Sequence, residues 1–290
     1  MESYQHFSTI AKNYTEVRTL DLDPILYIKN KIRNLPKIEM VEVGCGDGRY
    51  SLELIRALGS KLHLHCIDSN PEMIKYLQIL FARNKINNFK TTKASAENLP
   101  VEDNSVDCVI TLNAIHHFKL SEFLEEASRI LIDDGYLFIY TRLQSQNLNH
   151  IFGKYFPLFR QKETRLYELN ELEDILNGIS NLQIQSIESF RYERCRDMNR
   201  LIHQAQHHHY STFSLYSEKE FEQSLNEFKQ NLKMNFKEPK NIKWTDEYSL
   251  LVINKPKQNI INEPARISPQ TGSNPLLKYC INCSYCLLAI

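Results

Sequence analysis

Three glycines at alternate positions, Gly44, Gly46 and Gly48, follow the apolar-leaning run Ile38–Val43. Glycine permits a tight turn and leaves the main chain uncovered, so that a ligand can lie against it with its polar end at the N-terminus of a following helix. A dinucleotide-binding loop reads G-x-G-x-x-G and uses its third glycine for close packing of helix on strand. Here Arg49 stands at the position of the third glycine of that motif, and the third glycine of this chain, Gly48, comes one residue earlier. The spacing therefore indicates a ligand-binding turn and weakens the case for a dinucleotide.

Two carboxylates accompany this loop. Asp68 ends the next apolar run, about 20 residues further on, where an open α/β sheet places a carboxylate that accepts both hydroxyls of a ribose. The alternative is that Asp68 caps a helix beginning near Pro71, but Ser69 and Asn70 are better placed for capping. Glu42 directly precedes the first glycine, where a carboxylate is costly unless it receives hydrogen bonds or faces a ligand ammonium.

Strand-like and helix-like runs alternate between Ile38 and Arg142. This alternation is typical of βαβ units, whose helices cover a parallel sheet. We therefore predict an α/β fold with a doubly wound, Rossmann-like, mostly parallel sheet and helical cap insertions. The predicted strands are Ile38–Val43, Leu62–Ile67, Phe89–Lys93, Val106–Leu112 and Tyr136–Thr141, with a helix over Arg49–Leu58 after the first and a turn at Asp133-Asp134-Gly135 before the last.

The pattern changes after Arg142. The later elements that we predict are helices over Asn170–Asn177, Asp197–His207 and Ser217–Phe236 and strands over Leu182–Phe190 and Ser249–Asn254. The domain prediction is one domain over residues 1–255 with its core at 36–142, cap segments at 1–35, 143–181 and 196–240, and a flexible tail at 256–290 with a Cys-rich C-terminus.

Composition narrows the class of protein. The chain has 290 residues, 42% hydrophobic, with 35 Lys and Arg against 35 Asp and Glu, so its overall charge favours neither nucleic acid nor an anionic membrane. No apolar run is long enough to cross a bilayer, and the first residues lack the charged and apolar blocks of a signal peptide. Seven cysteines, two of them in predicted buried strands (Cys66 and Cys108), indicate a reducing compartment. We expect a cytoplasmic protein.

Three segments carry a specific resemblance. They are E-V-G-C-G-D-G-R-Y from Glu42, C-I-D-S-N-P-E-M from Cys66, and A-S-A-E-N-L-P-V-E-D-N-S-V-D-C-V-I-T-L-N-A-I-H-H-F from Ala94. In this order they resemble the class I S-adenosylmethionine-dependent methyltransferases, in particular the type 11 subgroup that includes the ubiquinone and menaquinone C-methyltransferases. The segment from Arg129 is similar to that family's R-x-L-x-P-G-G turn, and the residues around Tyr14 are similar to its N-terminal helix, which covers the cofactor.

The resemblance implies that S-adenosyl-L-methionine is the methyl donor. The glycine loop would hold its methionine part and Asp68 its ribose, while Asn113 would lie beside the methionine and the sulfonium. Many relatives carry Asp where Ser95 stands, so adenine recognition is expected to depend on Glu97 or on main chain. The cofactor-binding residues that we predict are Glu42, Gly44, Gly46, Gly48, Asp68, Ser69, Asn70, Ser95, Ala96, Glu97 and Asn113.

The sulfonium already makes its methyl group electrophilic, so the protein mainly aligns a nucleophile in line and excludes water. A hydroxyl or activated-carbon acceptor would need a general base, and His116 or His117, after the fourth strand, could supply it. The alternative is that one of this pair packs or hydrogen-bonds locally. Tyr14 is expected to close a lid over cofactor and substrate, with packing of its own helix as the alternative.

Three functions remain open. The favoured one is methyl transfer to a small-molecule acceptor. The second is tRNA methylation, since G-C-G-x-G-x-Y and I-H-H also resemble wobble-uridine tRNA enzymes, although the balanced charge gives this no support. The third is a non-catalytic module that only binds S-adenosylmethionine.

Other patterns carry less weight. His203 and His207 are one helical turn apart, but without an acidic ligand we favour a polar helix end near the substrate cleft over a metal site. Cys280, Cys283 and Cys286 lack a fourth ligand, and we favour an atypical tail over a metal or cluster site. The aromatics Phe152, Tyr155, Phe156, Phe159 and Tyr167, interleaved with Arg160, Lys162 and Arg165, fit either an acceptor pocket or a packed cap.

Overall fold

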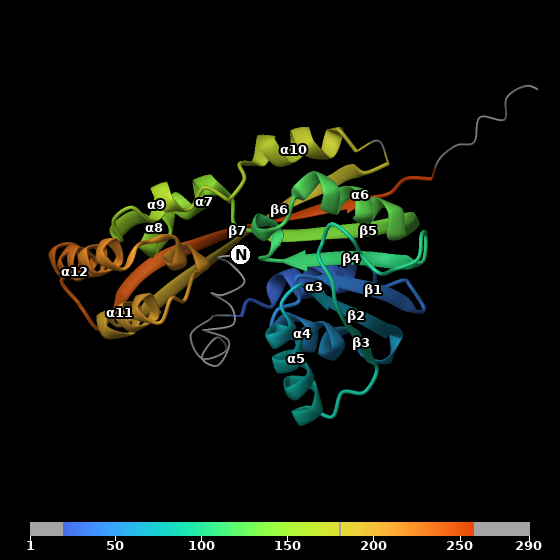
Figure 1. Ribbon diagram of the computed structural model, residues 1–290, viewed down its shortest axis with the longest axis horizontal. Helices are drawn as coiled ribbons and strands as arrows, with labels where there is room; N and C mark the ends of the chain where they lie inside the picture. Colours follow the sequence, from blue (N-terminus) through green and yellow to red (C-terminus); the bar gives the residue numbers. More distant parts are fainter. Residues whose placement is uncertain (1–19, 180, 258–290) are drawn as a thin grey trace, which may run out of the picture. The chain divides into compact units, whose positions relative to one another are not determined.

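The computed structural model describes residues 20–179 and 181–257 (Figure 1). They form a seven-stranded sheet with the order β3-β2-β1-β4-β5-β7-β6. The first five strands pair in parallel, and β7 runs antiparallel to both β5 and β6. The predicted doubly wound, mostly parallel sheet is therefore confirmed. Its strands are β1 (Ile38–Val43), β2 (Leu62–Asp68), β3 (Phe89–Lys93), β4 (Val106–Leu112), β5 (Leu131–Thr141), β6 (Gln183–Arg196) and β7 (Ile242–Asn254).

Helices cover both faces of this sheet (Figure 1). On one face lie α3 (Asp23–Lys31), α4 (Arg49–Leu58) and α5 (Pro71–Arg83), and on the other α6 (Leu120–Ile130) and α10 (Leu169–Asn177). Successive strand residues point to opposite faces, so Val109 joins one core while its neighbours Cys108 and Ile110 join the other. Cys66 and Cys108 are fully buried, as expected of cysteines that pack as small hydrophobes.

The predicted turn at Asp133-Asp134-Gly135 lies inside β5 as an irregularity. Val106 pairs with Leu131 and Cys108 with Tyr136, so β5 inserts extra residues opposite β4. A Cβ on Gly135 would lie 2.8 Å from the Ile132 carbonyl oxygen, which shows how tightly the backbone folds on itself there. The sequence predicted that this strand begins at Tyr136. It begins at Leu131, because β5 pairs with β4 on both sides of the bulge.

The last two strands are longer than the sequence indicates. They pair antiparallel from Gln183 opposite Asn254 to Arg196 opposite Ile242. Only Ser249–Asn254 of β7 also pairs with β5, so the remaining half of each strand continues beyond the sheet as a two-stranded ribbon. This ribbon connects the sheet to the cap (Figure 1).

The cap has a hydrophobic core of its own. It consists of α8 (Ile151–Tyr155), α9 (Phe159–Lys162), α11 (Met198–Gln206), η3 (Ser211–Leu215) and α12 (Glu218–Asn235), and α7 (Gln144–Asn149) leads into it from the sheet. Phe152, Phe156 and Phe159 are buried there against Phe213 and Phe228. Of the two alternatives for the aromatic run, a packed cap accounts for Phe152 and Phe156, whereas Phe159 both packs in the cap and lines the cavity.

The helix predictions in the second half agree closely with the structure. Asp197 caps α11 through its carboxylate, and Ser217 with Glu220 forms the expected capping box of α12. Within residues 20–179 and 181–257, no helix is long and apolar enough to cross a membrane. The predicted N-terminal helix with Tyr14, and Cys280, Cys283 and Cys286, lie outside the described residues.

Candidate functional site

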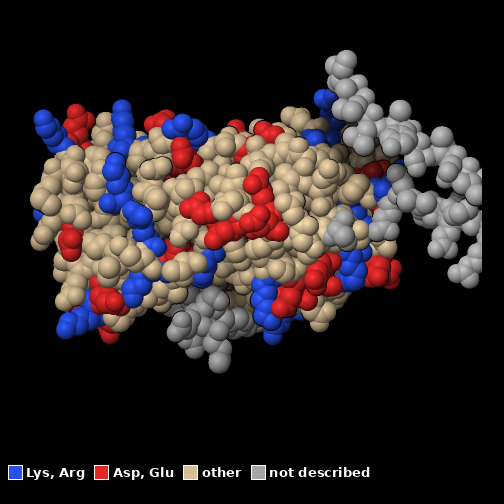
Figure 2. All heavy atoms as spheres, turned by 90° about the horizontal axis from the view of Figure 1, so that it is seen from above, with Lys and Arg blue, Asp and Glu red and all other residues tan. Residues whose placement is uncertain are grey.

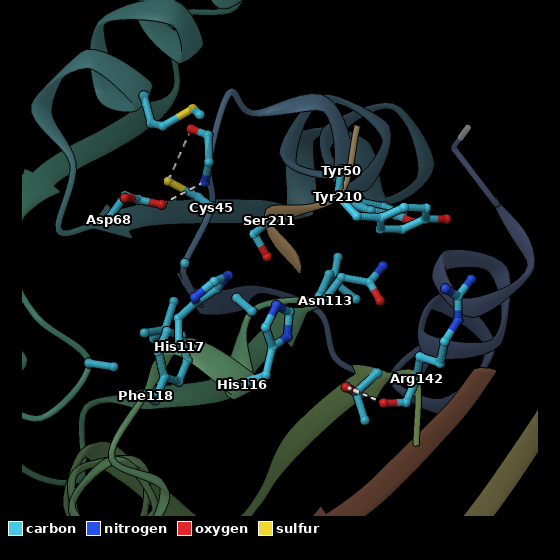
Figure 3. Close-up of a pocket in the computed structure, with 18 of the residues that line it drawn as sticks. Cys45, Tyr50, Asp68, Asn113, His116, His117, Phe118, Arg142, Tyr210 and Ser211 are labelled. Atoms are coloured by element: carbon cyan, nitrogen blue, oxygen red, sulfur yellow. Dashed lines mark hydrogen bonds between the residues drawn. The ribbon is translucent and has the colours of Figure 1, made fainter. Parts of the chain in front are cut away.

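A cavity of about 250 Å³ lies between the carboxyl ends of the parallel strands and the cap (Figure 3). One side comes from the sheet core and contains ten of the predicted cofactor-binding residues: Gly44, Gly46, Asp68, Ser69, Asn70, Ser95, Ala96, Glu97, Asn113 and, behind the loop, Gly48. All of these except Gly48 line the cavity directly. The other side comes from the end of β5, from β7 and from the cap, and contributes Arg142, Asn147, Phe159, Glu163, Leu166, His209, Tyr210, Ser211, Thr212, Asp246 and Tyr248.

The glycine loop is held by close approaches that explain its spacing. The N–H groups of Gly44 and Cys45 donate to the Ile67 carbonyl at 2.8 and 3.1 Å, which ties the loop to the end of β2. Gly48 has a φ of +82° at the start of α4, and a Cβ there would lie 2.5 Å from the side chain of Leu77 on α5. Gly48 thus gives the close helix packing that the third glycine of a dinucleotide loop would give.

Gly46 differs from its neighbours in the loop. It lines the cavity, and no described atom lies within 4 Å of the position that a Cβ would occupy. The main chain is therefore uncovered on the cavity side, which is the condition for a ligand to lie directly against it.

Asp68 connects the loop to the second strand. Its carboxylate accepts from the Gly46 N–H at 2.9 Å and from the Asn70 N–H at 2.8 Å, while lining the cavity. Burial raises the pKa of this carboxyl, and the two N–H donors oppose that rise. The cap of α5 is the Asn70 side chain, which accepts from the Glu72 N–H at 2.9 Å. The capping role that was the alternative for Asp68 therefore belongs to Asn70, and the Asp68 carboxylate lies at the cavity wall.

Asn113 and the two histidines follow β4 as one rigid turn. Asn113 has a left-handed φ of +57°, and its N–H donates to the Tyr140 carbonyl at 2.7 Å. His116 and His117 form η2 (Ile115–His117) and both line the cavity, with ring centroids 4.1 Å apart. The structure thus places both candidate bases beside Asn113 (Figure 3).

The predicted adenine-side residues lie along one stretch of wall. Ser69 and Ser95 are exposed, and Ala96 is buried. The Glu97 carboxylate lines the cavity and accepts from the Lys119 N–H at 2.8 Å. This bond fixes one oxygen of Glu97 at the start of α6 and leaves the carboxylate held at the cavity edge.

Glu42 does not line the cavity. It is 1% exposed, and its carboxylate accepts a 2.5 Å hydrogen bond from the Ser51 hydroxyl on α4. Burial raises its pKa from 4.5 to about 8, against the lowering effect of Ser51 and with a further rise from Asp47 and Asp68. A carboxylate at this position was expected either to receive hydrogen bonds or to face a ligand ammonium. The structure shows a hydrogen bond, from Ser51.

The cap segments predicted at 143–181 and 196–240 both contribute to the cavity, but most of the individual residues with which they line it were not predicted from sequence. The polar end of α11, with His203 and His207, was expected near the substrate cleft. Neither histidine lines the cavity, whereas His209, just beyond the helix, does. The neighbouring contributors Tyr210, Arg142 and Tyr248 come from three separate segments and carry no local motif. Among the residues that the structure describes, no three His, Cys, Asp or Glu side chains are grouped to hold a metal ion.

Comparisons with known proteins identify a methyltransferase domain in part of the chain. Residues 41–139 match the family described as methyltransferase domain. The chain contains a class I methyltransferase domain. Over these residues, which extend from β1 to β5, the methyltransferase resemblance predicted from the sequence motifs is confirmed.

Individual relatives support the methyltransferase domain over different lengths. A phthiotriol/phenolphthiotriol dimycocerosates methyltransferase of Mycobacterium leprae is 32% identical over 151 residues, which are 51% of this chain and 53% of that protein. The chain matches about a third to a half of the length of its first curated relatives.

Two solved structures share the fold. A putative methyltransferase from Bacillus halodurans has a TM-score of 0.59 at 16% identity, over 80% of this chain and 99% of that one. A SAM-dependent methyltransferase from Aquifex aeolicus has a TM-score of 0.52 at 18% identity, over 86% of this chain and 98% of that one. At these identities the likeness shows the fold of the methyltransferase domain.

The buried Glu42 makes a prediction about pH. Between its ordinary pKa of 4.5 and its raised pKa of about 8, the folded protein binds a proton that the unfolded chain has released. The free energy of unfolding therefore falls as the pH rises through this window, by about 1.4 kcal/mol per pH unit for one proton. Glu42→Gln should remove this fall, as measured by urea unfolding at about pH 6 and about pH 8.

The matched control is Glu39→Gln, on the same strand, because the Glu39 side chain is partly exposed and pairs with Lys37 at the surface. This variant should keep the wild-type dependence on pH. An equal dependence in wild type and Glu42→Gln would show that Glu42 is ionised in the folded protein at neutral pH.

Proposed function

We propose that this protein transfers a methyl group from S-adenosylmethionine to a small-molecule acceptor by in-line displacement. The observation that carries the proposal is the single cavity with two unlike walls. One wall holds the glycine loop, Asp68 and Asn113 of the methyltransferase domain, and the other is formed by the cap. A donor on the first wall and an acceptor on the second would meet inside one cavity.

The cofactor would bind across the carboxyl ends of β1, β2 and β4. Asp68 would accept from the ribose hydroxyls, since each of its oxygens has only one N–H donor and retains capacity for another. The uncovered main chain at Gly46 would face the methionine part, and Asn113 would lie near the sulfonium. Ser69, Asn70, Ser95, Ala96 and Glu97 would flank the adenine.

The geometry of the cap supports a small acceptor over a tRNA. The acceptor side of the cavity is closed by buried side chains such as Phe159 and Thr212 and leaves about 250 Å³ in all. The face in Figure 2 carries acidic side chains at its middle and a stripe of basic ones toward the cap end, so its basic surface does not extend over the whole face. The mycobacterial relatives are named as methyltransferases of phthiotriol and phenolphthiotriol dimycocerosates, which are not nucleic acids.

Proton removal would fall to the histidine pair. A hydroxyl or acidic carbon acceptor loses a proton as it takes the methyl group, and a base in hydrogen-bond reach assists that step. His116 and His117 are the two imidazoles on the wall that follows β4, next to Asn113. Tyr14, the predicted lid residue, lies outside the described residues.

The compartment that we propose is the cytoplasm. Cys45, Cys66 and Cys108 are buried free thiols. Unpaired buried cysteines are typical of proteins that fold in a reducing environment.

Cofactor binding can be tested by calorimetry with S-adenosylhomocysteine, the demethylated product. The wild-type protein should bind it. Asp68→Asn should bind it at least about tenfold more weakly, because the asparagine amide has one acceptor oxygen where the carboxylate has two. Asp103→Asn, a change at an exposed carboxylate that pairs with Arg129, should bind like wild type. No binding to wild type would contradict the proposed function, and equal binding to Asp68→Asn would contradict the ribose assignment.

The acceptor class can be tested with methyl-labelled S-adenosylmethionine and fractionated cell extract. We expect label in the small-molecule fraction, and only with the wild-type protein present. Label in the tRNA fraction would favour the tRNA methyltransferase alternative. Binding of the cofactor without transfer to any fraction would favour the non-catalytic module.

The role of the histidines can be tested with the acceptor fraction found in that way. Replacing the base by glutamine should lower the rate of transfer about a hundredfold, whereas the same change at the other histidine should have little effect. His116→Gln and His117→Gln should both bind S-adenosylhomocysteine like wild type. Unchanged rates in both variants would show that the acceptor needs no base from this pair.

A further inference from the structure

Arg142 is a buried cation in the acceptor wall, the side of the cavity that the end of β5, β7 and the cap form. It follows the last residue of β5, is 6% exposed and lines the cavity. Its guanidinium carbon lies 4.6 Å from the ring centroid of Tyr248 and 5.4 Å from that of Tyr210. A guanidinium stays charged at any physiological pH, so its burial at this place requires compensation.

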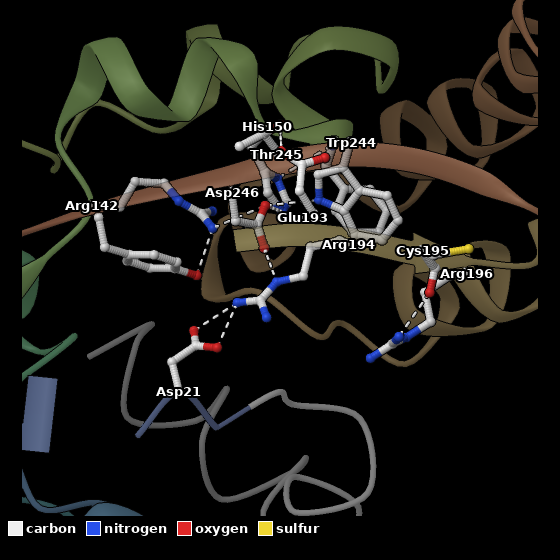
Figure 4. A network of polar contacts seen from close by, with 12 residues as sticks. Asp21, Arg142, His150, Glu193, Arg194, Cys195, Arg196, Trp244, Thr245 and Asp246 are labelled. Atoms are coloured by element: carbon white, nitrogen blue, oxygen red, sulfur yellow. Dashed lines mark hydrogen bonds and ion pairs between the residues drawn. The ribbon is translucent and has the colours of Figure 1, made fainter. Parts of the chain in front are cut away.

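The nearest carboxylate compensates Arg142 only in part (Figure 4). Asp246 lies 3.7 Å from the Arg142 Nη2, which is beyond hydrogen-bond distance. The Asp246 oxygens are taken by the Arg194 Nε at 3.0 Å and the Trp244 Nε1 at 2.8 Å. Asp246 therefore compensates Arg194 more closely than it compensates Arg142.

Two further carboxylates that line the cavity, Asp21 and Glu163, are also engaged. Both oxygens of Asp21 accept from the Arg194 Nη2 at 2.7 Å. Glu163 accepts from the Arg165 Nη2 at 2.6 Å and from the Thr212 hydroxyl at 2.5 Å. Neither carboxylate bonds to Arg142, and a neighbouring arginine offsets the repulsion that each would exert on an anion.

Arg142 also has donors to spare. Its Nη2 donates to the Tyr248 hydroxyl at 2.6 Å, and its buried Nε has no hydrogen-bond partner among the described residues. Because arginine has no acceptor, the Tyr248 oxygen must accept in this bond, which leaves the Tyr248 O–H to donate elsewhere. Two neighbouring groups in the wall thus offer hydrogen atoms, and a ligand with acceptor oxygens would satisfy both.

We infer that Arg142 binds an anionic oxygen group, a carboxylate or a phosphate, on the methyl acceptor. The planar fork of arginine matches the two oxygens of such a group, and the bond is charge-assisted. The rings of Tyr210 and Tyr248 flank the guanidinium and also line the cavity, so they would provide apolar contact for the part of the acceptor next to the anion. The inference rests on the proposed function, because it assigns the second wall of the cavity to the acceptor.

The test uses three small aromatic probes: benzoate, phenyl phosphate and their neutral analogue benzamide. Binding to the full-length protein is measured by ligand-observed NMR, with and without S-adenosylhomocysteine. Wild type should bind benzoate or phenyl phosphate about ten to a hundred times more tightly than benzamide. Whichever anion binds better identifies the carboxylate or the phosphate as the group recognised.

The variants separate the role of Arg142 from a general effect of charge. Arg142→Gln should lose the preference for the anion, and Arg142→Lys should weaken it severalfold because the fork is lost. Arg191→Gln removes the same charge from an exposed position on β6 and should leave the preference unchanged. Both Arg142 variants should bind S-adenosylhomocysteine within about twofold of wild type, which reports an intact fold.

Equal binding of benzamide and both anions to wild type would overturn the inference. So would an unchanged anion preference in Arg142→Gln or, should that variant not fold, in Arg142→Lys. Failure of the proposed function looks different: wild type would not bind S-adenosylhomocysteine, while the anion preference measured without it would still depend on Arg142.

Discussion

The pairing of β5 with β7 is the constraint on which the rest of the structure depends. It adds an antiparallel strand to a parallel sheet, with Tyr136 opposite Asn254 and Thr141 opposite Ser249. The register ends where β5 ends, so Arg142 emerges next to Tyr248 and donates to its hydroxyl. Beyond this point β7 has only β6 as a neighbour, and the two strands continue as the ribbon that joins the cap. One strand pairing thus brings the cap to the ligand edge of the sheet and sets a cation in the wall between them.

The first half of the chain was predictable because its signals are local. The helix over Arg49–Leu58 and the strand over Phe89–Lys93 have the bounds expected from the sequence. Each lies in a βαβ unit whose apolar residues face a helix layer, so periodicity and turn residues suffice to define it. The ribbon is different. The strand predicted over Leu182–Phe190 stops where charged residues such as Arg191 and Glu193 begin to alternate, yet β6 continues to Arg196. Its outer half is a strand because it pairs with β7, and a partner about fifty residues away leaves little trace in local hydrophobicity.

The same difference between local and distant signals divides the candidate site. The cofactor wall could be proposed from sequence because the glycine loop, Asp68 and Asn113 each follow a strand of the parallel sheet. The sequence predicted the cap segments of the acceptor wall but not its cation, since Arg142 and Tyr248 are 106 positions apart and meet only through the β5–β7 register. Glu42 shows the limit of the local argument. Its position before the first glycine indicated a role toward the ligand, whereas its side chain turns away from the cavity to Ser51. The sequence indicates that a carboxylate here needs a partner, but only the packing of α4 on β1 determines which partner it has.

The charges around the cavity fit the two proposals together. Three carboxylates, Asp47, Asp68 and Glu97, line the cofactor wall against one cation, Arg49, which pairs with Asp47. This wall is therefore net negative, which suits a cofactor that carries a sulfonium cation. Across the cavity the carboxylates are paired with arginines, and Arg142 is the cation with spare donors. An anionic acceptor held there would face a cationic donor, and transfer of the methyl group would neutralise the sulfonium. Between walls of low dielectric constant, attraction between these charges is stronger than in bulk water and would help to bring donor and acceptor into line. The opposed charges of the two walls thus provide a physical reason why a donor and an acceptor of this kind would bind in the orientation that the reaction needs.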